Sequence, residues 1–211
     1  MSKDDINYYK VHIINRLGEI DDRRDTIDVI EWLKKTDFFE APASTKFHGA
    51  FSGGLAQHSW NVYSWLLRLN DWYCAKIPYD SIIITALLHD VCKIGLYKSD
   101  YKNVKSYDTE DVKNDMRNAR QDAKGIFVWK QEPIYIVEED LKYGGHGSKS
   151  VYLISQFLRL KPEEAAAINC HMGAYGESKI QQENVSPVYE TNPLAFLLHV
   201  ADETSTFIDH I

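Results

Sequence analysis

ALLHDVCKIG, residues 86–95, joins an apolar helical run to an adjacent histidine and aspartate, His89 and Asp90. Residues three and four apart lie on one face of a helix, so Asp90 shares its face with the apolar residues Ile83 and Leu87. A carboxylate on an apolar face costs free energy unless it is paired or bound to a metal. The glycine that closes the stretch is expected to end the helix. The stretch therefore predicts a helical fold with polar chemistry in its interior.

Other histidines and aspartates also lie on or next to apolar faces of separate predicted helices. His58 lies within an apolar pattern that runs from residue 55 to residue 72, and His171 follows a short helix that begins at Pro162. Asp202 lies on the leucine-rich final helix, where a lone buried carboxylate is rare. Together they indicate either a buried polar network or a metal site.

The chemistry of these side chains restricts the metal. Imidazole with carboxylate suits Mn, Fe, Co, Ni or Zn, and no cysteine accompanies the set, so a structural zinc site is not expected. Consecutive residues diverge by about 100° around a helix, so His89 and Asp90 reach one ion only near a helix end. Asp90 has two oxygens and could hold one ion with each. Two ions held in this way can activate a bridging water and clamp a phosphate oxygen.

Composition sets the class of protein. The chain has 211 residues and a net charge of −7, which fits one domain and disfavours long nucleic acid as a partner. Three cysteines without a CxxC pair indicate reduced thiols. No signal peptide or membrane-spanning run is recognisable, so we expect a cytoplasmic protein that does not enter a membrane. The oligomeric state cannot be read from the sequence.

The fold class predicted is all-α, a helical bundle formed by a single domain over residues 1–211. Residues 97–145 are expected to form an insertion. Two short runs rich in β-branched and aromatic residues flank Lys130–Pro133, which predicts a small β-hairpin at 126–138. The insertion could serve as a lid, as a wall of the substrate site or as a plain loop.

Five stretches, in their order along the chain, resemble the HD-domain superfamily of metal-dependent phosphohydrolases, including uncharacterised members from bacterial and phage genomes. They span about residues 53–206 and read GGLAQHSWNV, ALLHDVCKIG, GGHGSKSV, INCHMG and LLHVADETS. The resemblance implies an HD-type helical bundle and one or two divalent transition metals. It implies that His58, His89, Asp90 and Asp202 hold the first metal, that Asp90 bridges to a second, and that His146 and His171 complete the second site.

The family often shows HD-x-G-K, and here Lys93 is present while Cys92 replaces the glycine. Lys93 could contact a substrate phosphate or stabilise developing charge, which makes it a catalytic candidate beside Asp90. Ser148 and Lys149 could bind phosphate at a helix N-terminus, or could simply cap that helix. Trp129 is a third candidate for substrate binding.

Each residue also has a structural interpretation. A single core histidine is more often packed than ligating, and His171 could be a polar helix end favoured by the helix dipole. His199 could orient a ligand or simply pack in the core. His48 has no partner in the pattern and is expected at the surface.

Three functions follow from these residues. The first is hydrolysis of a phosphomonoester or phosphodiester, in a nucleotide or another small phosphate ester, by a metal-activated water. The second is the chemistry of the diiron oxygenases that the same superfamily contains. The third is a non-catalytic nucleotide-binding sensor, although the complete ligand set speaks against a degenerate site.

Overall fold

A helical body carrying a long β-ribbon forms the part of the chain that the computed structural model describes, residues 1–20, 23, 25–46, 48–138, 144–175 and 179–209. Within that part lie nine α-helices, three short 3-10 helices and three strands. The α-helices are α1 (Lys3–Gly18), α2 (Thr26–Lys35), α3 (Gly54–Tyr73), α4 (Tyr79–Leu88), α5 (Thr109–Asn114), α6 (His146–Ile154), α7 (Pro162–Cys170), α8 (Lys179–Thr191) and α9 (Pro193–Phe207). The remaining elements are η1 (Val91–Lys93), η2 (Met116–Asn118), η3 (Gly173–Tyr175), β1 (Tyr97–Ser106), β2 (Arg120–Asp122) and β3 (Gly125–Val137).

The prediction of an all-α fold is wrong. The three strands form one antiparallel sheet in the order β1-β3-β2, and β3 alone is 13 residues long. The chain is therefore mostly helical with a distinct antiparallel sheet. The sequence did not predict β1, because residues 97–106 are mostly polar. A strand that covers no hydrophobic core does not need the alternating apolar pattern by which strands are recognised.

The hairpin predicted at 126–138 is also placed wrongly, because Lys130–Pro133 are not a turn. They lie inside β3, where Pro133 faces Tyr101 of β1. Over this length β3 has a neighbour on one side only, and such an edge position tolerates proline. The tight connection lies instead at residues 123–124, between β2 and β3.

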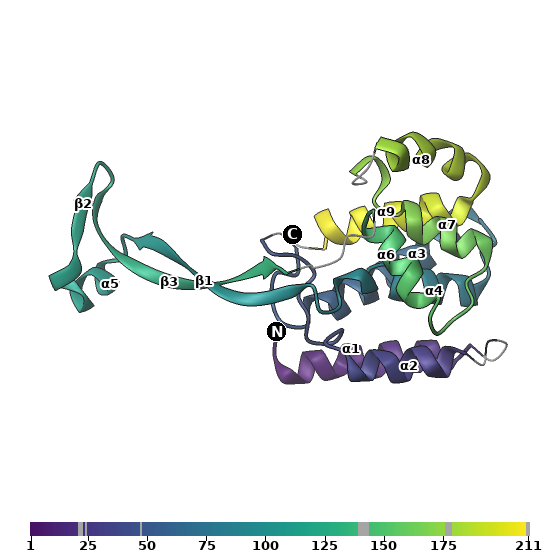
Figure 1. The fold of residues 1–211 in the computed structure, drawn as a ribbon, viewed down its shortest axis with the longest axis horizontal. Coiled ribbons are helices and arrows are strands. Elements are labelled where there is room, and N and C mark those ends of the chain that lie inside the picture. Colours follow the sequence, from purple (N-terminus) through teal and green to yellow (C-terminus); the bar gives the residue numbers. More distant parts are fainter. Residues whose placement is uncertain (21–22, 24, 47, 139–143, 176–178, 210–211) are drawn as a thin grey trace.

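The ribbon of β1 and β3 extends away from the helical body, with α5 and β2 at its far end (Figure 1). We call residues 97–138 the arm. Its two ends lie together, because Tyr97 pairs with Val137 at the base of the ribbon. The insertion expected at 97–145 stays a prediction, because its last part, residues 139–143, lies outside the described part of the chain.

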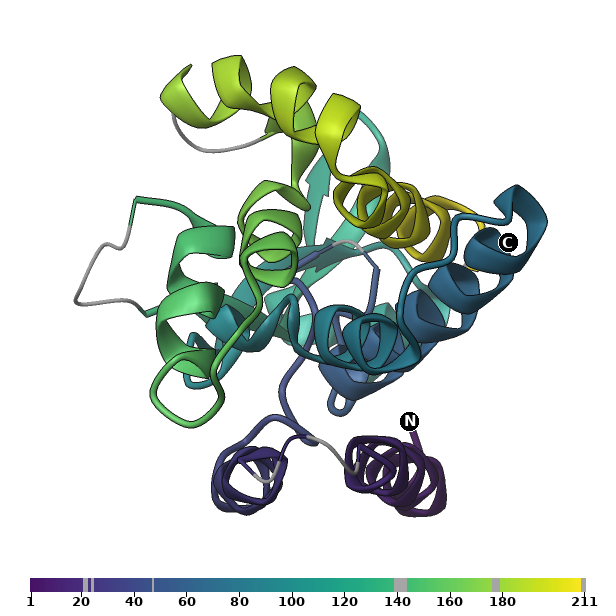
Figure 2. The ribbon, with the colours of Figure 1, turned by 90° about the vertical axis from the view of Figure 1, so that its right-hand side faces the viewer.

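The core of the body surrounds α4. All residues from Ser81 to Leu88 are buried, which is typical of a helix that is covered on every side. Helices α3, α7 and α9 pack around it, while α1 and α2 lie side by side beneath the others (Figure 2). No helix in the described ranges is both long and apolar enough to cross a bilayer.

Candidate metal centre

His89 and Asp90 lie where α4 ends and the chain turns into η1. His89 is the C-cap of α4, and the backbone of Asp90 has left the helical conformation (φ −108°, ψ 16°). This break removes the divergence that a continuous helix would impose on two consecutive side chains. Both side chains therefore reach the same buried space, as the expectation of a helix end required.

His171 occupies the same position in α7 that His89 occupies in α4. Each caps its helix, and each places its Nδ1 next to the carbonyl oxygen three residues earlier. These distances are 2.9 Å to Ala86 for His89 and 2.6 Å to Ile168 for His171. A ring that donates through Nδ1 leaves its Nε2 lone pair available, so both histidines present Nε2 to the interior.

His58 comes from α3 and Asp202 from α9, two helices that pack side by side. The Nδ1 of His58 lies 3.2 Å from the hydroxyl of Ser205, which is also on α9. Its Nε2 lies 3.0 Å from Oδ1 of Asp202. The contact between these helices thus fixes the direction of both side chains.

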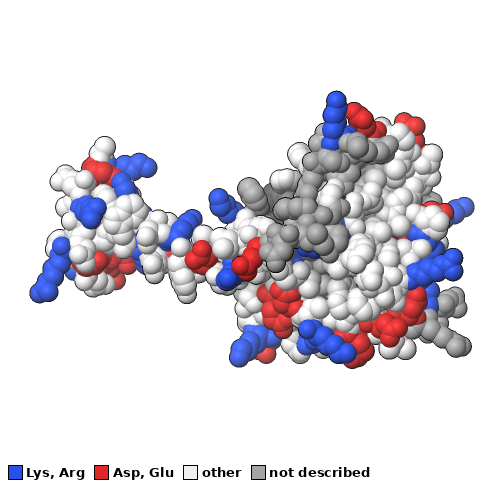
Figure 3. All heavy atoms as spheres, in the orientation of Figure 1, with Lys and Arg blue, Asp and Glu red and all other residues white. Residues whose placement is uncertain are grey.

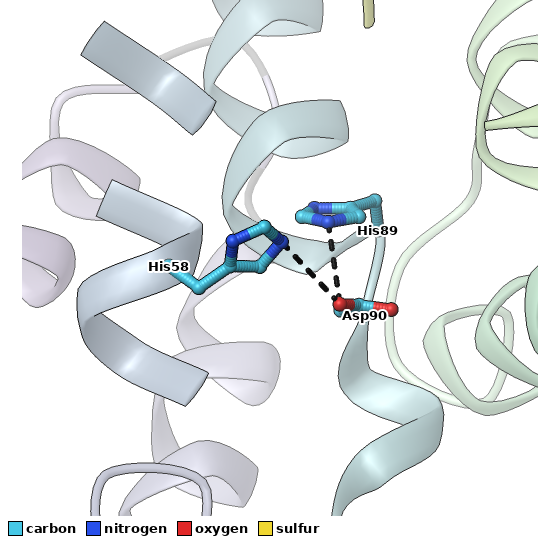
Figure 4. A group of neighbouring side chains, drawn as sticks. All are labelled: His58, His89 and Asp90. Atoms are coloured by element: carbon cyan, nitrogen blue, oxygen red, sulfur yellow. Dashed lines mark ion pairs between the residues drawn. The ribbon is translucent and has the colours of Figure 1, made fainter. Parts of the chain in front are cut away.

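The three buried histidines converge on Asp90. Its Oδ2 lies 3.6 Å from Nε2 of His58 and 3.5 Å from Nε2 of His89, so both rings point at one carboxylate oxygen (Figure 4). Its Oδ1 lies 3.6 Å from Nε2 of His171. The two oxygens of Asp90 therefore face different histidines. Two groups can each offer three ligand atoms within 4.8 Å of one another, His58 with His89 and Asp90, and His89 with His171 and Asp202.

The Nε2 atoms of His58, His89 and His171 are buried, and each lies 3.0–3.6 Å from a carboxylate oxygen without the alignment of a hydrogen bond. Burying an unsatisfied polar atom typically costs about 1–3 kcal/mol, and three in one place need an explanation. A divalent transition metal would satisfy them, because imidazole nitrogen and carboxylate oxygen are the ligands such ions prefer. The residues present therefore fit a metal.

The protonation of the group follows from its burial and its charges. Burial raises the pKa of the Asp90 carboxyl, but the charge of Lys93, together with the contact to His89, outweighs burial and holds that pKa well below its usual range. Burial lowers the pKa of His58, and the attraction of Asp202 offsets only part of this effect. Asp90 is thus an anion and His58 a neutral ring at neutral pH, the forms in which both can ligate a metal.

Lys93 extends from η1 and donates a hydrogen bond to Oδ2 of Asp90 at 2.6 Å. Burial lowers the pKa of this lysine, but the charge of Asp90 outweighs burial and the pKa is raised. Lys93, Asp90 and Asp202 line a cavity of about 960 Å³. A cation therefore stands beside the candidate metal ligands at the wall of a space that could hold a small molecule.

The structure brings only some of the other predicted residues to this cavity. His146, the first residue of α6, lines it but belongs to neither of the two ligand groups. Ser148 donates to the side chain of Asn169 on α7 at 2.9 Å, and neither it nor Lys149 is among the described residues that line the cavity. Trp129 lies far out on the arm, where it pairs with Lys105 and lines a different pocket.

The sequence did not identify His48, which was expected at the surface but lines the cavity. Its ring lies 4.9 Å from that of His58, and burial lowers its pKa to about 4. Phe51 and Tyr97 also line the cavity and were not predicted. His48 and Phe51 come from the loop before α3, so no helical periodicity marked them.

Comparisons of the chain with protein-family models, with curated proteins and with solved structures found no match.

Proposed function

We propose that this chain is a metal-dependent phosphohydrolase that acts on a nucleotide or another small phosphate ester. One observation supports the proposal: the Nε2 atoms of three buried histidines converge on the carboxylate of Asp90 without an aligned hydrogen bond to it. The same residues, in the same order, give the chain its resemblance to the HD-domain superfamily. Membership of that superfamily is part of the proposal.

The metal ligands proposed are His58, His89, Asp90, His171 and Asp202. Because the oxygens of Asp90 face different histidines, this residue is suited to bridge two ions, with His146 as a further candidate for the second. Mn, Fe, Ni, Co and Zn all fit this ligand set. When bound, the ions would lower the pKa of a coordinated water and polarise a phosphoryl oxygen.

The chain's own side chains would position the ester. Lys93 lines the cavity and would donate to a non-bridging phosphate oxygen, which stabilises the negative charge that develops during attack. Phe51, Met172 and Phe207 line the same cavity and offer an apolar surface for the organic part of the substrate. In the reaction the water oxygen forms a bond to phosphorus, the ester P–O bond breaks, and the leaving oxygen takes up a proton.

The test begins with protein freed of metal by a chelator and reloaded separately with Mn, Ni, Co, Zn or, without oxygen, Fe. Release of phosphate or alcohol is measured on nucleotides, cyclic nucleotides and aryl phosphate mono- and diesters. We expect turnover only after reloading and a loss of at least about 100-fold in Asp90→Asn, because that residue ligates the metal in the proposal. The exposed Asp28→Asn on α2 is the matched control and should keep full activity.

The proposal fails if no ester turns over and Asp90→Asn binds as much metal as the wild type. Oxygen uptake by the iron-loaded protein without release of phosphate would replace it with the oxygenase. Tight nucleotide binding without turnover, whichever metal is loaded, would indicate a non-catalytic nucleotide-binding sensor instead of a phosphohydrolase.

A further inference from the structure

One face of the arm carries a row of aromatic side chains. Directly opposed residues of an antiparallel pair share a face, and successive pairs alternate between faces. The register therefore puts four aromatic residues on the same face: Tyr97 opposite Val137, Tyr135 opposite Ser99, Tyr101 opposite Pro133 and Trp129 opposite Lys105. We call these four residues the aromatic face. Two of its members are well exposed, Tyr101 at 65% and Trp129 at 47%.

The aromatic face starts at the candidate metal centre. Tyr97 lines the same cavity as Asp90 and Lys93, and its hydroxyl donates to the carbonyl oxygen of Ala43 at 3.4 Å. Trp129 pairs with Lys105, eight residues along β1 from Tyr97, which corresponds to about 26 Å at the usual rise of a strand. The row thus leads from the cavity out along the arm.

The outer end of the row is a second pocket. Trp129 lines a space of about 440 Å³ together with Arg117, Arg120 and one acidic residue, Asp115, so the charged side chains of the pocket are basic on balance. Within the described part of the chain these two arginines form no ion pair, whereas Lys105 lies 2.5 Å from Asp122 and 4.3 Å from the ring centre of Phe127. A planar aromatic ring and two arginines in one pocket suit a ligand that combines a planar group with an anion.

The charge of the arm differs from that of the body. Residues 97–138 hold eight Lys or Arg and eight Asp or Glu, so the whole net charge of −7 belongs to the rest of the chain. On the side drawn in Figure 3, basic and acidic side chains are interspersed along the arm. Lys98, Lys102 and Lys130 form exposed ion pairs, which contribute little stability and can be exchanged for a phosphate. A short polyanion is therefore repelled less here than on the body.

We infer that the aromatic face binds a short single-stranded oligonucleotide and leads its end to the metal centre. Unpaired bases stack on the tyrosines and on Trp129, and Arg117 and Arg120 hold phosphates at the outer end. Every base has a face that can stack, so binding tolerates many sequences but requires a single strand. The inference rests on the proposed function, in that the ester hydrolysed is a phosphodiester of the strand. Water adds to phosphorus, one P–O bond breaks, and the departing strand end leaves as a hydroxyl that has taken the proton.

Binding can be measured without the metal. Metal-free protein in chelator is titrated into a fluorescent oligothymidylate of about 12 nucleotides, and anisotropy is read at several salt concentrations. We expect Trp129→Ala and Tyr101→Ala each to weaken binding about tenfold. The double variant Arg117→Ala/Arg120→Ala should reduce the slope of log K against log salt by about 1.4, because two phosphate contacts are lost.

The matched controls lie on the body. Trp72 is 68% exposed at the end of α3, and Lys34 and Lys35 are exposed at the end of α2. Trp72→Ala and the double variant Lys34→Ala/Lys35→Ala should leave both the affinity and the salt slope unchanged. A duplex of the same length should compete poorly with the single strand.

Four results would overturn the inference: no binding at low salt, equal binding of duplex and single strand, an affinity unchanged by Trp129→Ala, or controls that weaken binding as much as the arm variants. A dimer seen by sedimentation that Trp129→Ala disrupts, with no oligonucleotide bound, would instead make the face a contact between two copies of the chain. If the oligonucleotide binds as expected, but no ester is hydrolysed and Asp90→Asn binds as much metal as the wild type, the binding face stands and the phosphohydrolase proposal fails. If a small ester is hydrolysed but no strand binds, only this inference fails.

Discussion

The carboxylate of Asp90 is the residue on which the candidate centre depends. One of its oxygens faces His58 and His89, and the other faces His171. Lys93 also donates to it, which accounts for an anionic carboxylate in a fully buried position. If Asp90 bridges two ions, replacing it should remove more metal than replacing a histidine that faces only one of its oxygens.

We therefore expect His171→Gln to bind about one metal ion per chain and Asp90→Asn to bind almost none, against about two for the wild type. Metal content after dialysis, measured by mass spectrometry, provides the numbers. His12→Gln, on α1 and away from the cavity, is the control. Equal metal content in Asp90→Asn and His171→Gln would argue against a bridge.

Asp122 is a second residue whose protonation can be followed, at the outer end of the arm. Hydrogen bonds from Lys105 and from the backbone of Lys124 lower the pKa of its carboxyl to about 2. Because the pKa in the folded chain lies below the unfolded value of about 4, the ion pair stabilises the arm above pH 4. This stabilisation is lost as the pH falls through about 2.

We expect the carboxyl carbon of Asp122 to titrate near pH 2 by NMR. Lys105→Met should move the midpoint upward, toward about 4, because it removes the principal hydrogen bond. Lys113→Met, on α5, should leave it in place, since Lys113 is not among the groups that shift the pKa of Asp122. An unchanged midpoint in Lys105→Met would show that the ion pair does not form.

At the scale of elements, the close contact between α6 and α7 holds two candidate ligands in place. Gly147 directly follows His146 and packs against the end of α7, where the carbonyl oxygen of Ile168 orients His171. A Cβ at Gly147 would lie 2.6 Å from that oxygen and closer still to the carbonyl oxygen of Asn169. Backbone atoms cannot move aside as a flexible side chain could.

Gly147→Ala should therefore push α6 and α7 apart and destabilise the chain by about 1–3 kcal/mol. The free energy of unfolding in urea and the metal content should both fall. Gly18→Ala is the control, because a Cβ there meets no atom within 4 Å and Gly18 lies in α1. A Gly147→Ala variant as stable as Gly18→Ala would show that the two helices can separate freely.

At the scale of the whole molecule, the arm joins the body at one end of its ribbon. The pairs Tyr97–Val137 and Lys98–Ile136 bring the two strands together there, so a tight turn could replace everything beyond them. The buried residues of the body, such as those of α4, lie outside the arm. The body should therefore not need the arm in order to fold.

We expect a chain in which Asn-Gly replaces residues 99–135 to unfold within about 5 °C of the wild type, with unchanged metal content. Calorimetry and metal analysis provide the comparison. The full-length variant Trp129→Ala is the control, because its change is confined to the arm. Failure of the shortened chain to fold would contradict the prediction of a helical domain with an insertion.

The sequence alone determined the helices that carry the site. Pro162 begins α7 as predicted, while Pro193 begins α9 and Gly54 begins α3. Helical periodicity made this possible, because His58 and Asp202 lie on faces whose apolar neighbours must be buried. Local spacing also showed that His89 and Asp90 required a helix end.

Only the tertiary structure decided what these helices assemble. It brought Nε2 of three histidines from three elements around Asp90, and it placed His48 from a loop beside them. Residues 97–138 were expected to form a short hairpin within a loop, but they form a long ribbon. In this ribbon Trp129 lies far from the cavity. Strand pairing over 40 positions and the packing of loops depend on contacts between distant residues, which no local pattern in the chain encodes.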